Sequence, residues 1–387
     1  MNIGWFGLGK LGMICSEVIV DKGHSVTGYD INKVTSDKVN VVTDPRLAVE
    51  EKDFVFVAVQ TPHDPNYGGE KPITHLPNKD FSTEYVKQCL TEINKYATEN
   101  TIVVLISTVL PGTTRREFAH LLDKARFIYN PYLIAMGTVA WDMVNPDMVI
   151  IGGEHPADAD AIKLQNFYKT IMENNPHYNI GTWEEAEATK IFYNTFISAR
   201  LSLVNMIQDV AERVGHMDVD VVTSSLGSAG YRITSDAYMR AGMGDGGPCH
   251  PRDNIALRHL AERLNLGYDL FDAIAKSREV QAENMAKEIL KYGKNIHFTS
   301  DTYKPGVEYT DGSYSLLVQH YVQKHGGVLV NGFDNPIEVI VRVHPEDQFT
   351  VDEKTVVFDP WRLYYTSNPN VKVVHYGKTR SPRISHS

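Results

Sequence analysis

The chain has 387 residues, of which 42% are hydrophobic and 22% charged, with a formal net charge of −10 at pH 7. This composition is typical of a soluble globular protein and excludes disordered, collagen-like and membrane-spanning classes. The acidic balance excludes a basic nucleic-acid-binding surface, so we expect no nucleic-acid partner and no membrane partner. Three cysteines are too few for a disulfide framework, and no signal peptide is expected before the first strand, so we expect a cytoplasmic protein.

The first 180 residues alternate short apolar runs with polar helical stretches. This alternation predicts a parallel sheet with crossover helices, the doubly wound α/β arrangement of a Rossmann domain over residues 1–180. We expect buried strands at residues 3–6, 25–29, 54–59, 102–106, 127–129 and 148–151.

A glycine motif, GLGKLG at residues 7–12, follows the first strand and opens a helix. In this context Gly7, Gly9 and Gly12 allow a tight turn, close approach of a pyrophosphate and close packing of helix on strand. Asp30 follows about 20 residues later, where it can accept hydrogen bonds from a ribose and repel a 2′-phosphate. The motif therefore predicts NAD rather than NADP as cofactor.

Two further predicted strands end in polar turns, VAVQTP at residues 57–62 and ISTVLPGT at 106–113. Ligands of doubly wound sheets bind beyond the carboxyl ends of the strands, so we expect Thr61, Ser107 and Thr108 to line the cofactor cleft. Ordinary turn chemistry is the alternative explanation.

From residue 181 to 293 the pattern changes to helical periodicity, with long helices expected at 184–214 and 268–291 and a break at 242–251. This predicts an all-helical central domain. Short strands then return around one helix near 313–325, which predicts a small α/β domain over residues 294–377. We expect strands at 295–299, 327–330, 338–343, 355–358 and 371–374, and a disordered tail at 378–387.

The sequence GDGGPCHPRD at residues 244–253 places Cys249 in a glycine-rich turn with Asp253 four residues later. A thiolate at a loop apex is typical of a catalytic nucleophile. Lys190 and Asn194 lie four residues apart on one helix face, where they can stabilise an oxyanion, although a solvated polar face also explains them. Glu187 fits either a site residue beside Lys190 or an i,i+3 ion pair with it, and both explanations fit the sequence equally well. No histidine spacing is typical of a metal site, so we expect none.

Taken together, these motifs resemble the UDP-glucose/GDP-mannose dehydrogenase family. The resemblance rests on the glycine motif, Asp30, the cysteine turn and further segments: VAVQTP, STVLPGTT at 107–114, PDMVIIGG at 146–153 and AEATKIFYN at 186–194. It implies an NAD-dependent oxidoreductase that converts the sugar C6 alcohol of a nucleotide sugar such as UDP-glucose to a uronic acid through a Cys249 thiohemiacetal and thioester. It also implies that the central domain mediates dimerisation and that the third domain binds the nucleotide sugar.

The resemblance also implies roles for individual residues. Cys249 is the nucleophile, Asp253 orders a water, and Lys190 and Asn194 stabilise oxyanions. Thr108 places a hydroxyl near the reacting carbon. Arg232 reaches the substrate of the neighbouring subunit, which implies a homodimer. The remaining implied binding residues are Leu11 for the cofactor and Tyr132, Leu133, Gly246 and Lys304 for the substrate.

The chain departs from the family pattern at several positions, which include Asp245 and Pro248 in the cysteine turn and a shorter stretch between Asp30 and Val41. Tyr132 stands where the family has a glutamate used in thioester hydrolysis, Met136 replaces a second acid, and Asp311 replaces an arginine. These departures leave two alternatives open: a related nucleotide-sugar oxidoreductase with an altered or incomplete reaction, and a non-catalytic nucleotide-binding protein.

Overall fold

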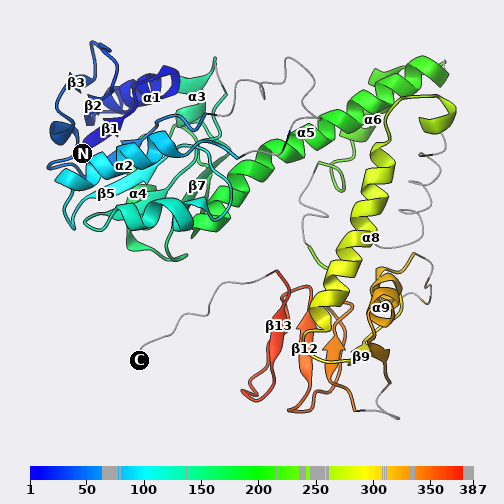
Figure 1. Ribbon diagram of the computed structural model, residues 1–387. Helices are drawn as coiled ribbons and strands as arrows, with labels where there is room; N and C mark the ends of the chain where they lie inside the picture. Colours follow the sequence, from blue (N-terminus) through cyan, green and yellow to red (C-terminus); the bar gives the residue numbers. More distant parts are fainter. Residues whose placement is uncertain are drawn as a thin grey trace. The chain divides into compact units, whose positions relative to one another are not determined.

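The computed structural model describes most of the chain, and its residues divide into two compact units, Met1–Arg200 and Leu201–Ser387 (Figure 1). The described residues are 1–62, 77, 80–135, 137–214, 216–234, 241–244, 258, 261–306, 308, 310, 312–331 and 336–377, without seven side chains at 198, 201, 202, 205, 208, 209 and 212.

An eight-stranded sheet forms the centre of the first unit, in the order β3-β2-β1-β4-β5-β6-β7-β8. The strands are β1 Asn2–Phe6, β2 Ser25–Tyr29, β3 Asn40–Val42, β4 Phe54–Val57, β5 Ile102–Leu105, β6 Arg126–Tyr129, β7 Met148–Gly153 and β8 His177–Thr182. The first six pair in parallel, β6 pairs antiparallel with β7, and β8 is parallel to β7. The predicted Rossmann-like α/β fold is confirmed, with two additional strands, β3 and β8.

Alternating strand residues build two separate cores, one on each face of this sheet. Ile3, Trp5, Phe54 and Phe56 belong to one cluster, whereas Val55 and its register partner Val103 belong to the other. This period of two is the geometry of a sheet covered on both faces. Figure 1 shows the covering helices: α1 Lys10–Asp21, α2 Glu84–Tyr96, α3 Val139–Val144 and α4 Ala159–Tyr168.

Helix α5, Trp183–Val214, begins in the first unit directly after β8. A capping box starts it: the Thr182 backbone N–H donates to the Glu185 carboxylate at 2.9 Å, and the Glu185 N–H donates to the Thr182 hydroxyl at 3.3 Å. Trp183 is buried, and its indole N–H donates to the Phe127 carbonyl at 3.3 Å. The first turn of α5 is therefore held against the sheet.

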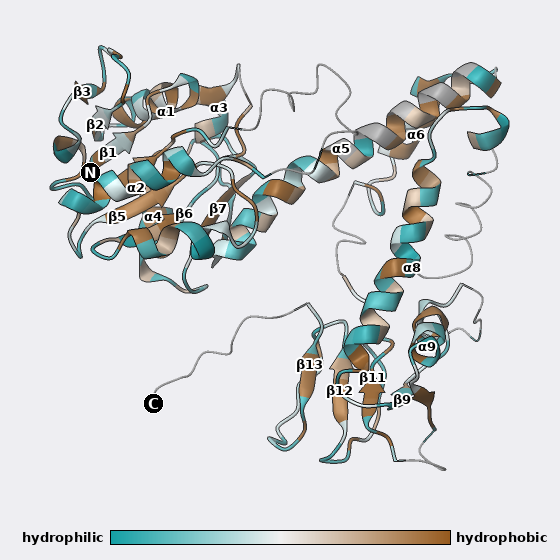
Figure 2. Cartoon of the chain, in the orientation of Figure 1, coloured by the Kyte–Doolittle hydropathy of each residue, from teal (hydrophilic) through white to brown (hydrophobic). Residues whose placement is uncertain are grey.

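The second unit contains the rest of α5, α6 Val219–Gly227, α8 Leu270–Ile289 and a five-stranded parallel sheet with the helix α9 Tyr314–Lys324. Its strands, in the order β10-β9-β11-β12-β13, are β9 Asn295–Phe298, β10 Val328–Leu329, β11 Val339–Val341, β12 Val356–Asp359 and β13 Val373–His375. Apolar side chains of α8 and α9 share one core with this sheet, and β11 and β12 have the hydrophobic colour in Figure 2.

The helices and strands expected from the sequence in this unit are present, with ends that differ by at most two residues. The three domain boundaries remain predictions, and the tail at 378–387 lies outside the described residues. None of the helices in the described part of the chain is both long and apolar enough to cross a membrane.

Candidate functional site

The glycine turn after β1 leaves the N-terminus of α1 open to a ligand. Gly7 has φ of +90°, and a Cβ on Gly12 would lie 1.9 Å from the Gly7 carbonyl oxygen, so both positions require glycine. Gly9, the N-cap of α1, has no atom within 4 Å of an added Cβ, and no side chain caps the helix. Free backbone N–H groups at an uncapped helix N-terminus fit a pyrophosphate. Leu11 lies in the first turn and is partly buried.

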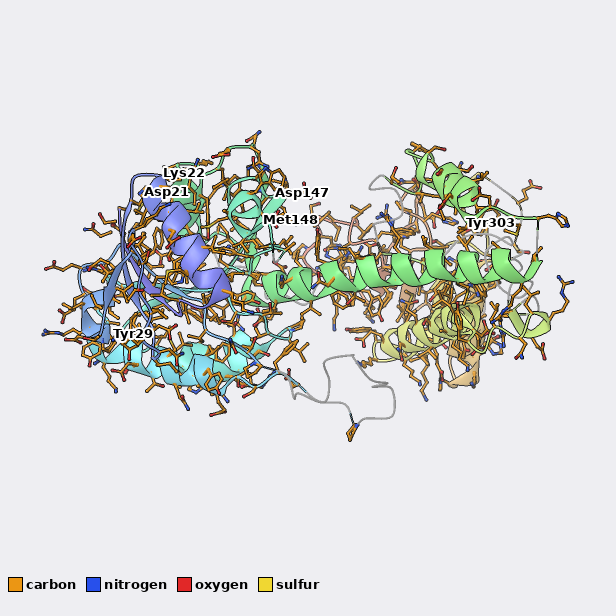
Figure 3. The ribbon with its side chains drawn as sticks, turned by 90° about the horizontal axis from the view of Figure 1, so that it is seen from above. Asp21, Lys22, Tyr29, Asp147, Met148 and Tyr303 are labelled. Atoms are coloured by element: carbon orange, nitrogen blue, oxygen red, sulfur yellow. The ribbon has the colours of Figure 1, made fainter. Side chains whose placement is uncertain are left out.

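Asp30 directly follows β2, next to Tyr29, which Figure 3 labels. One carboxylate oxygen accepts the Leu8 N–H at 2.7 Å, and the other accepts the Asn32 N–H at 2.8 Å. The second oxygen also accepts the Asn32 side-chain amide at 3.1 Å, so the oxygen that accepts from Leu8 is the one with a further lone pair. The glycine turn therefore holds a partly exposed carboxylate, which fits a ribose hydroxyl.

The turns after β4 and β5 are joined by two hydroxyl groups. The Thr61 hydroxyl donates to the Thr108 carbonyl at 2.8 Å, and the Ser107 hydroxyl donates to the Val59 carbonyl at 2.5 Å. The three predicted residues thus come together at the carboxyl edge of the sheet, where each donated hydroxyl can still accept a hydrogen bond.

Glu187 binds the same edge to α5. Its buried carboxylate accepts the Gly112 N–H at 2.5 Å and the Thr114 N–H at 2.7 Å. Burial raises the pKa of Glu187, and these N–H groups oppose the rise. The predicted ion pair with Lys190 is wrong, because among the described residues the Glu187 carboxylate bonds instead to these backbone N–H groups, more than 70 residues away in the sequence.

Lys190 lies one turn further along α5. Its ammonium donates to the Tyr132 carbonyl at 2.6 Å, and burial lowers its pKa. A partly buried ammonium fixed by one hydrogen bond keeps two N–H donors for an oxyanion. Asn194, the next residue on this face, is exposed.

The Tyr132 side chain takes part in a hydrogen-bond network beneath the loop after β6. Its hydroxyl lies 2.9 Å from the Tyr168 hydroxyl, which donates to Asn130, and Asn130 donates to the Ile150 carbonyl at 2.7 Å. Burial raises the pKa of Tyr132 well above its usual value. The void here measures about 20 Å³, room for about one water, and Leu133 lies at its wall.

In the second unit, Arg232 is exposed after α6, and Lys304 is exposed in the loop after β9. Lys304 follows Tyr303, labelled in Figure 3, and its ammonium lies 6.0 Å from the Tyr303 ring centroid. Both side chains are accessible to a ligand.

A cavity of about 500 Å³ lies in the second unit at the carboxyl ends of β12 and β13. The Gln281 side-chain oxygen is buried without a hydrogen-bond partner in the described structure. The sequence did not indicate this cavity, since its walls come from four separate segments of the chain. They include Ala241, Gly242, Gln281, Pro360, Arg362 and Tyr376.

The predicted nucleophile Cys249, together with Asp253 and Gly246, lies outside the described residues, as do Met136 and Asp311. The other two cysteines are free, and burial raises the pKa of Cys15 to about 12 and that of Cys89 further. Neither is suited to act as a thiolate at neutral pH. Within the described ranges, no group of three or more His, Cys, Asp or Glu side chains could hold a metal ion.

Comparison with known proteins places these features in context. The NAD-binding domain of the UDP-glucose/GDP-mannose dehydrogenase family matches residues 33–172, and its central domain matches residues 184–279. UDP-glucose 6-dehydrogenase of Rickettsia prowazekii is 24% identical over 330 residues, covering 80% of this chain and 75% of that protein. GDP-mannose 6-dehydrogenase of Pseudomonas putida is 26% identical over 393 residues, covering 92% and 85%.

The fold is also that of a solved member of this group. The crystal structure of GDP-mannose dehydrogenase from Pseudomonas aeruginosa superposes with a TM-score of 0.81 at 20% identity, over 96% of this chain and 99% of the other. With two family domains matched over most of its length and an open dinucleotide turn after β1, the chain belongs to the UDP-glucose/GDP-mannose dehydrogenase family, whose N-terminal domain binds NAD.

Proposed function

We propose that the protein oxidises the C6 alcohol of a nucleotide sugar, of the UDP-glucose kind, to a uronic acid through a covalent intermediate on Cys249. The observation that carries the proposal is the Lys190 ammonium, fixed at 2.6 Å on the loop after β6 in a chain with both family domains. The relatives named above act on UDP-glucose or GDP-mannose, and UDP-glucose is our first candidate.

The cofactor residues of this proposal surround the open end of α1. Gly7, Gly9, Leu11 and Gly12 would hold the pyrophosphate, and Asp30 the ribose. Thr61, Ser107 and Thr108 would line the cleft beyond them. When bound, NAD supplies the hydride acceptor for both oxidations.

The proposed reaction has three steps: two oxidations, joined by attack of a nucleophile, and a final hydrolysis. The C6 alcohol loses a hydride and a proton to become an aldehyde. The Cys249 thiolate then forms a C–S bond to the aldehyde carbon, and loss of a second hydride leaves a thioester. Water breaks the C–S bond, and the overall change is alcohol, two NAD⁺ and one water to carboxylate, two NADH and three protons.

Lys190 and Asn194 would stabilise the alkoxide and thiohemiacetal oxyanions, because an ammonium and an amide donate without needing a proton transfer. Asp253 would order the attacking water, and the Thr108 hydroxyl would lie near the reacting carbon. The 500 Å³ cavity would take the nucleotide, with Lys304 and Arg232 toward the phosphates and sugar, and with Tyr132, Leu133 and Gly246 as further substrate contacts.

A homodimer belongs to the same proposal. Phe192 is 55% exposed and Phe196 60% exposed on α5, which carries hydrophobic segments along its length in Figure 2. Exposed aromatic side chains on one helix are typical of an interface. Light scattering should give twice the 43.5 kDa chain mass; a monomer at micromolar concentration would contradict a stable dimer.

The Tyr132 network favours a second candidate, a related oxidoreductase that fails at the last step. A carboxylate at position 132 could assist hydrolysis. The Tyr132 hydroxyl is instead hydrogen-bonded to Tyr168, and burial raises its pKa well above the usual value, so it stays protonated. In this case the thioester would accumulate and each chain would release up to two NADH once rather than repeatedly.

The test is the NADH yield from a panel of UDP- and GDP-sugars, with wild type and Cys249→Ala. Full oxidation predicts two NADH per sugar and loss of this yield in Cys249→Ala. A limited burst without turnover would support the second candidate. An unchanged two-step yield in Cys249→Ala would exclude the thiol mechanism, and binding without NADH for every sugar would indicate a non-catalytic protein.

A further inference from the structure

Asn130, the first residue after β6, is fixed by the strands on either side of it. Its backbone N–H donates to the Leu105 carbonyl of β5 at 2.8 Å, and its side-chain amide donates to the Ile150 carbonyl of β7 at 2.7 Å. The residue is completely buried. Asn130 therefore anchors the start of the loop after β6 to the backbone of two strands.

Tyr168, from α4, completes this anchor. Its hydroxyl donates to the Asn130 side-chain oxygen, so the amide is hydrogen-bonded through both its oxygen and its nitrogen. Because the Tyr168 proton is used in this way, the Tyr132 hydroxyl donates to the Tyr168 oxygen, at 2.9 Å. The two tyrosine rings meet edge to face with centroids 6.5 Å apart, and Tyr168 is 1% exposed, so both bonds are shielded from bulk water.

One residue separates this anchor from the loop carbonyl that binds Lys190. That residue, Pro131, is buried, and its ring fixes φ at about −65°. The Tyr132 carbonyl then accepts a hydrogen bond from the Lys190 ammonium at 2.6 Å. With Asn130 held by two strands and the Tyr132 side chain held by Tyr168, this carbonyl has little freedom to move.

Lys190 depends on that carbonyl for its orientation. The helix that carries it is fixed one turn earlier, where Glu187 accepts the N–H groups of Gly112 and Thr114. Among the described residues, the Tyr132 carbonyl is the hydrogen-bond partner of the Lys190 ammonium. Since a lysine ammonium lies at the end of a flexible stem, the position of this carbonyl decides where the two remaining N–H donors point.

We propose that Asn130 and Tyr168 are positioning residues that set the location of the Lys190 ammonium through the Tyr132 carbonyl. The inference rests on the proposed function, in which Lys190 stabilises the alkoxide and thiohemiacetal oxyanions. An oxyanion donor is most effective when it is fixed before the charge develops, and a displacement of about 1 Å can cost about 100-fold in rate. The buried amide and hydroxyl would therefore act on the reaction without touching the substrate.

The rate of NADH formation in the first turnover, measured by rapid mixing with NAD and UDP-glucose or the best sugar of the panel, tests the proposal. Asn130→Ala removes both side-chain bonds and should lower this rate at least about 10-fold, with the apparent affinity for NAD unchanged. Tyr168→Phe keeps the ring and should lower the rate about 3- to 10-fold, the equivalent of about one hydrogen bond. Hydrogen exchange of the loop after β6 should become faster in both variants.

A double-mutant cycle separates positioning from general damage. If Asn130 acts through Lys190, the variant that combines Lys190→Met with Asn130→Ala should react no more slowly than Lys190→Met alone. The same is expected for Lys190→Met with Tyr168→Phe, which decides the question if Asn130→Ala does not fold. Rate losses that multiply in the double variants would show a structural role alone and contradict the proposal.

Two control variants match these changes elsewhere in the same unit. Asn94→Ala removes an asparagine that also joins two segments, because its amide donates to Asp123 at 2.5 Å and accepts the Lys124 N–H at 3.2 Å. Tyr178→Phe removes a hydroxyl that has no hydrogen-bond partner among the described residues, from a ring packed on the same core as Tyr168. Both variants should keep the wild-type rate.

The outcomes distinguish this inference from the proposed function. If Lys190→Met is slow while Asn130→Ala and Tyr168→Phe match wild type, the inference alone is wrong. If Lys190→Met matches wild type, or if no sugar yields NADH, the proposed function fails at Lys190 or as a whole, and the inference fails with it.

Discussion

A buried carboxylate collects backbone N–H groups at the carboxyl edge of each sheet, but the two carboxylates act over different distances. Asp359, after β12, accepts the N–H groups of Trp361, Leu363 and Tyr364 at 3.0, 2.6 and 2.7 Å, all within five residues. Glu187 accepts those of Gly112 and Thr114, 75 and 73 residues away. Asp359 shapes its own loop, whereas Glu187 joins helix α5 to a turn that is distant in the sequence.

The difference indicates how each edge is prepared for a ligand. At the N-terminal edge, Glu187 fixes α5 on the turn after β5, and this places Lys190 against the turn after β6. At the C-terminal edge, the loop shaped by Asp359 presents Trp361 and Arg362 to the segment 241–244. The N-terminal edge thus positions the charge of Lys190, and the C-terminal edge positions the segment 241–244.

The largest expected effect tests whether the N-terminal edge supplies the charge for chemistry. Lys190→Met should lower kcat/KM about 100- to 1,000-fold, the usual cost of losing one oxyanion donor. Because burial lowers the pKa of Lys190, the ammonium is lost at a lower pH than in an ordinary lysine, so wild-type activity should fall on the alkaline side below pH 10.5. Lys190→Arg should move this decline to higher pH.

A pH–rate series on purified protein measures both effects. Lys95→Met is the matched control, because Lys95 is an exposed lysine of the same unit that pairs only with the neighbouring helix residue Glu92 among the described residues. If Lys190→Met behaves like Lys95→Met, Lys190 takes no part in the reaction and the N-terminal edge supplies no charge for it.

The second largest expected effect is a loss of stability when Asp359, the carboxylate that binds its own loop, is removed. Asp359→Ala removes the acceptor of three partly buried N–H groups and should destabilise the second unit by about 3 kcal/mol, at about 1 kcal/mol for each group. Urea unfolding followed by hydrogen exchange should locate the loss in the second unit. Equal loss of protection in β1 to β6 would show that the two edges are not independent.

Glu187→Gln tests the long-range carboxylate and should cost about 1–2 kcal/mol, because the amide keeps only one acceptor oxygen for two N–H groups. Unlike Asp359→Ala, it should also lower kcat, since α5 would no longer be fixed beside the turn at 112–114. Melting temperature and kcat are both needed here. A stability loss with wild-type kcat would mean that Glu187 does not position Lys190.

Tyr132→Phe gives the smallest expected effect. It removes one hydrogen bond, to Tyr168, and should cost about 0.5–1.5 kcal/mol while the Lys190 contact to the backbone carbonyl remains. Tyr168→Phe removes two bonds, to Tyr132 and Asn130, and should cost more. A large gain of NADH turnover in Tyr132→Glu, compared with Tyr132→Phe, would identify position 132 as the block in hydrolysis.

The same contrast explains what the sequence predicted. Strands such as 54–57 and 102–105 were predictable because buried runs between turn residues have a local cause. Strand β3 has three residues, and β8 reads HYNIGT without an apolar run, so neither has a clear local signal.

The candidate site likewise contains local features that the sequence predicts and long-range contacts that it does not. The glycine turn and Asp30 were predictable because their spacing is local. An ion pair with the helix neighbour Lys190 was one of two explanations for Glu187, and it is wrong. The sequence does not show that the turn at 112–114 lies against α5. The Arg362 contact to Ala241 spans 121 residues and has no sequence signature.

The most direct test of the central claim is the mass of the protein during turnover. Protein mixed with NAD and UDP-glucose, or with the best sugar of the panel, is quenched in acid, and the intact chain and its peptides are weighed. We predict an acyl adduct with the mass of the oxidised nucleotide sugar on the peptide that contains Cys249, and none in Cys249→Ala. Rapid formation of two NADH per sugar with no adduct at any quench time, and an equal yield in Cys249→Ala, would contradict the account.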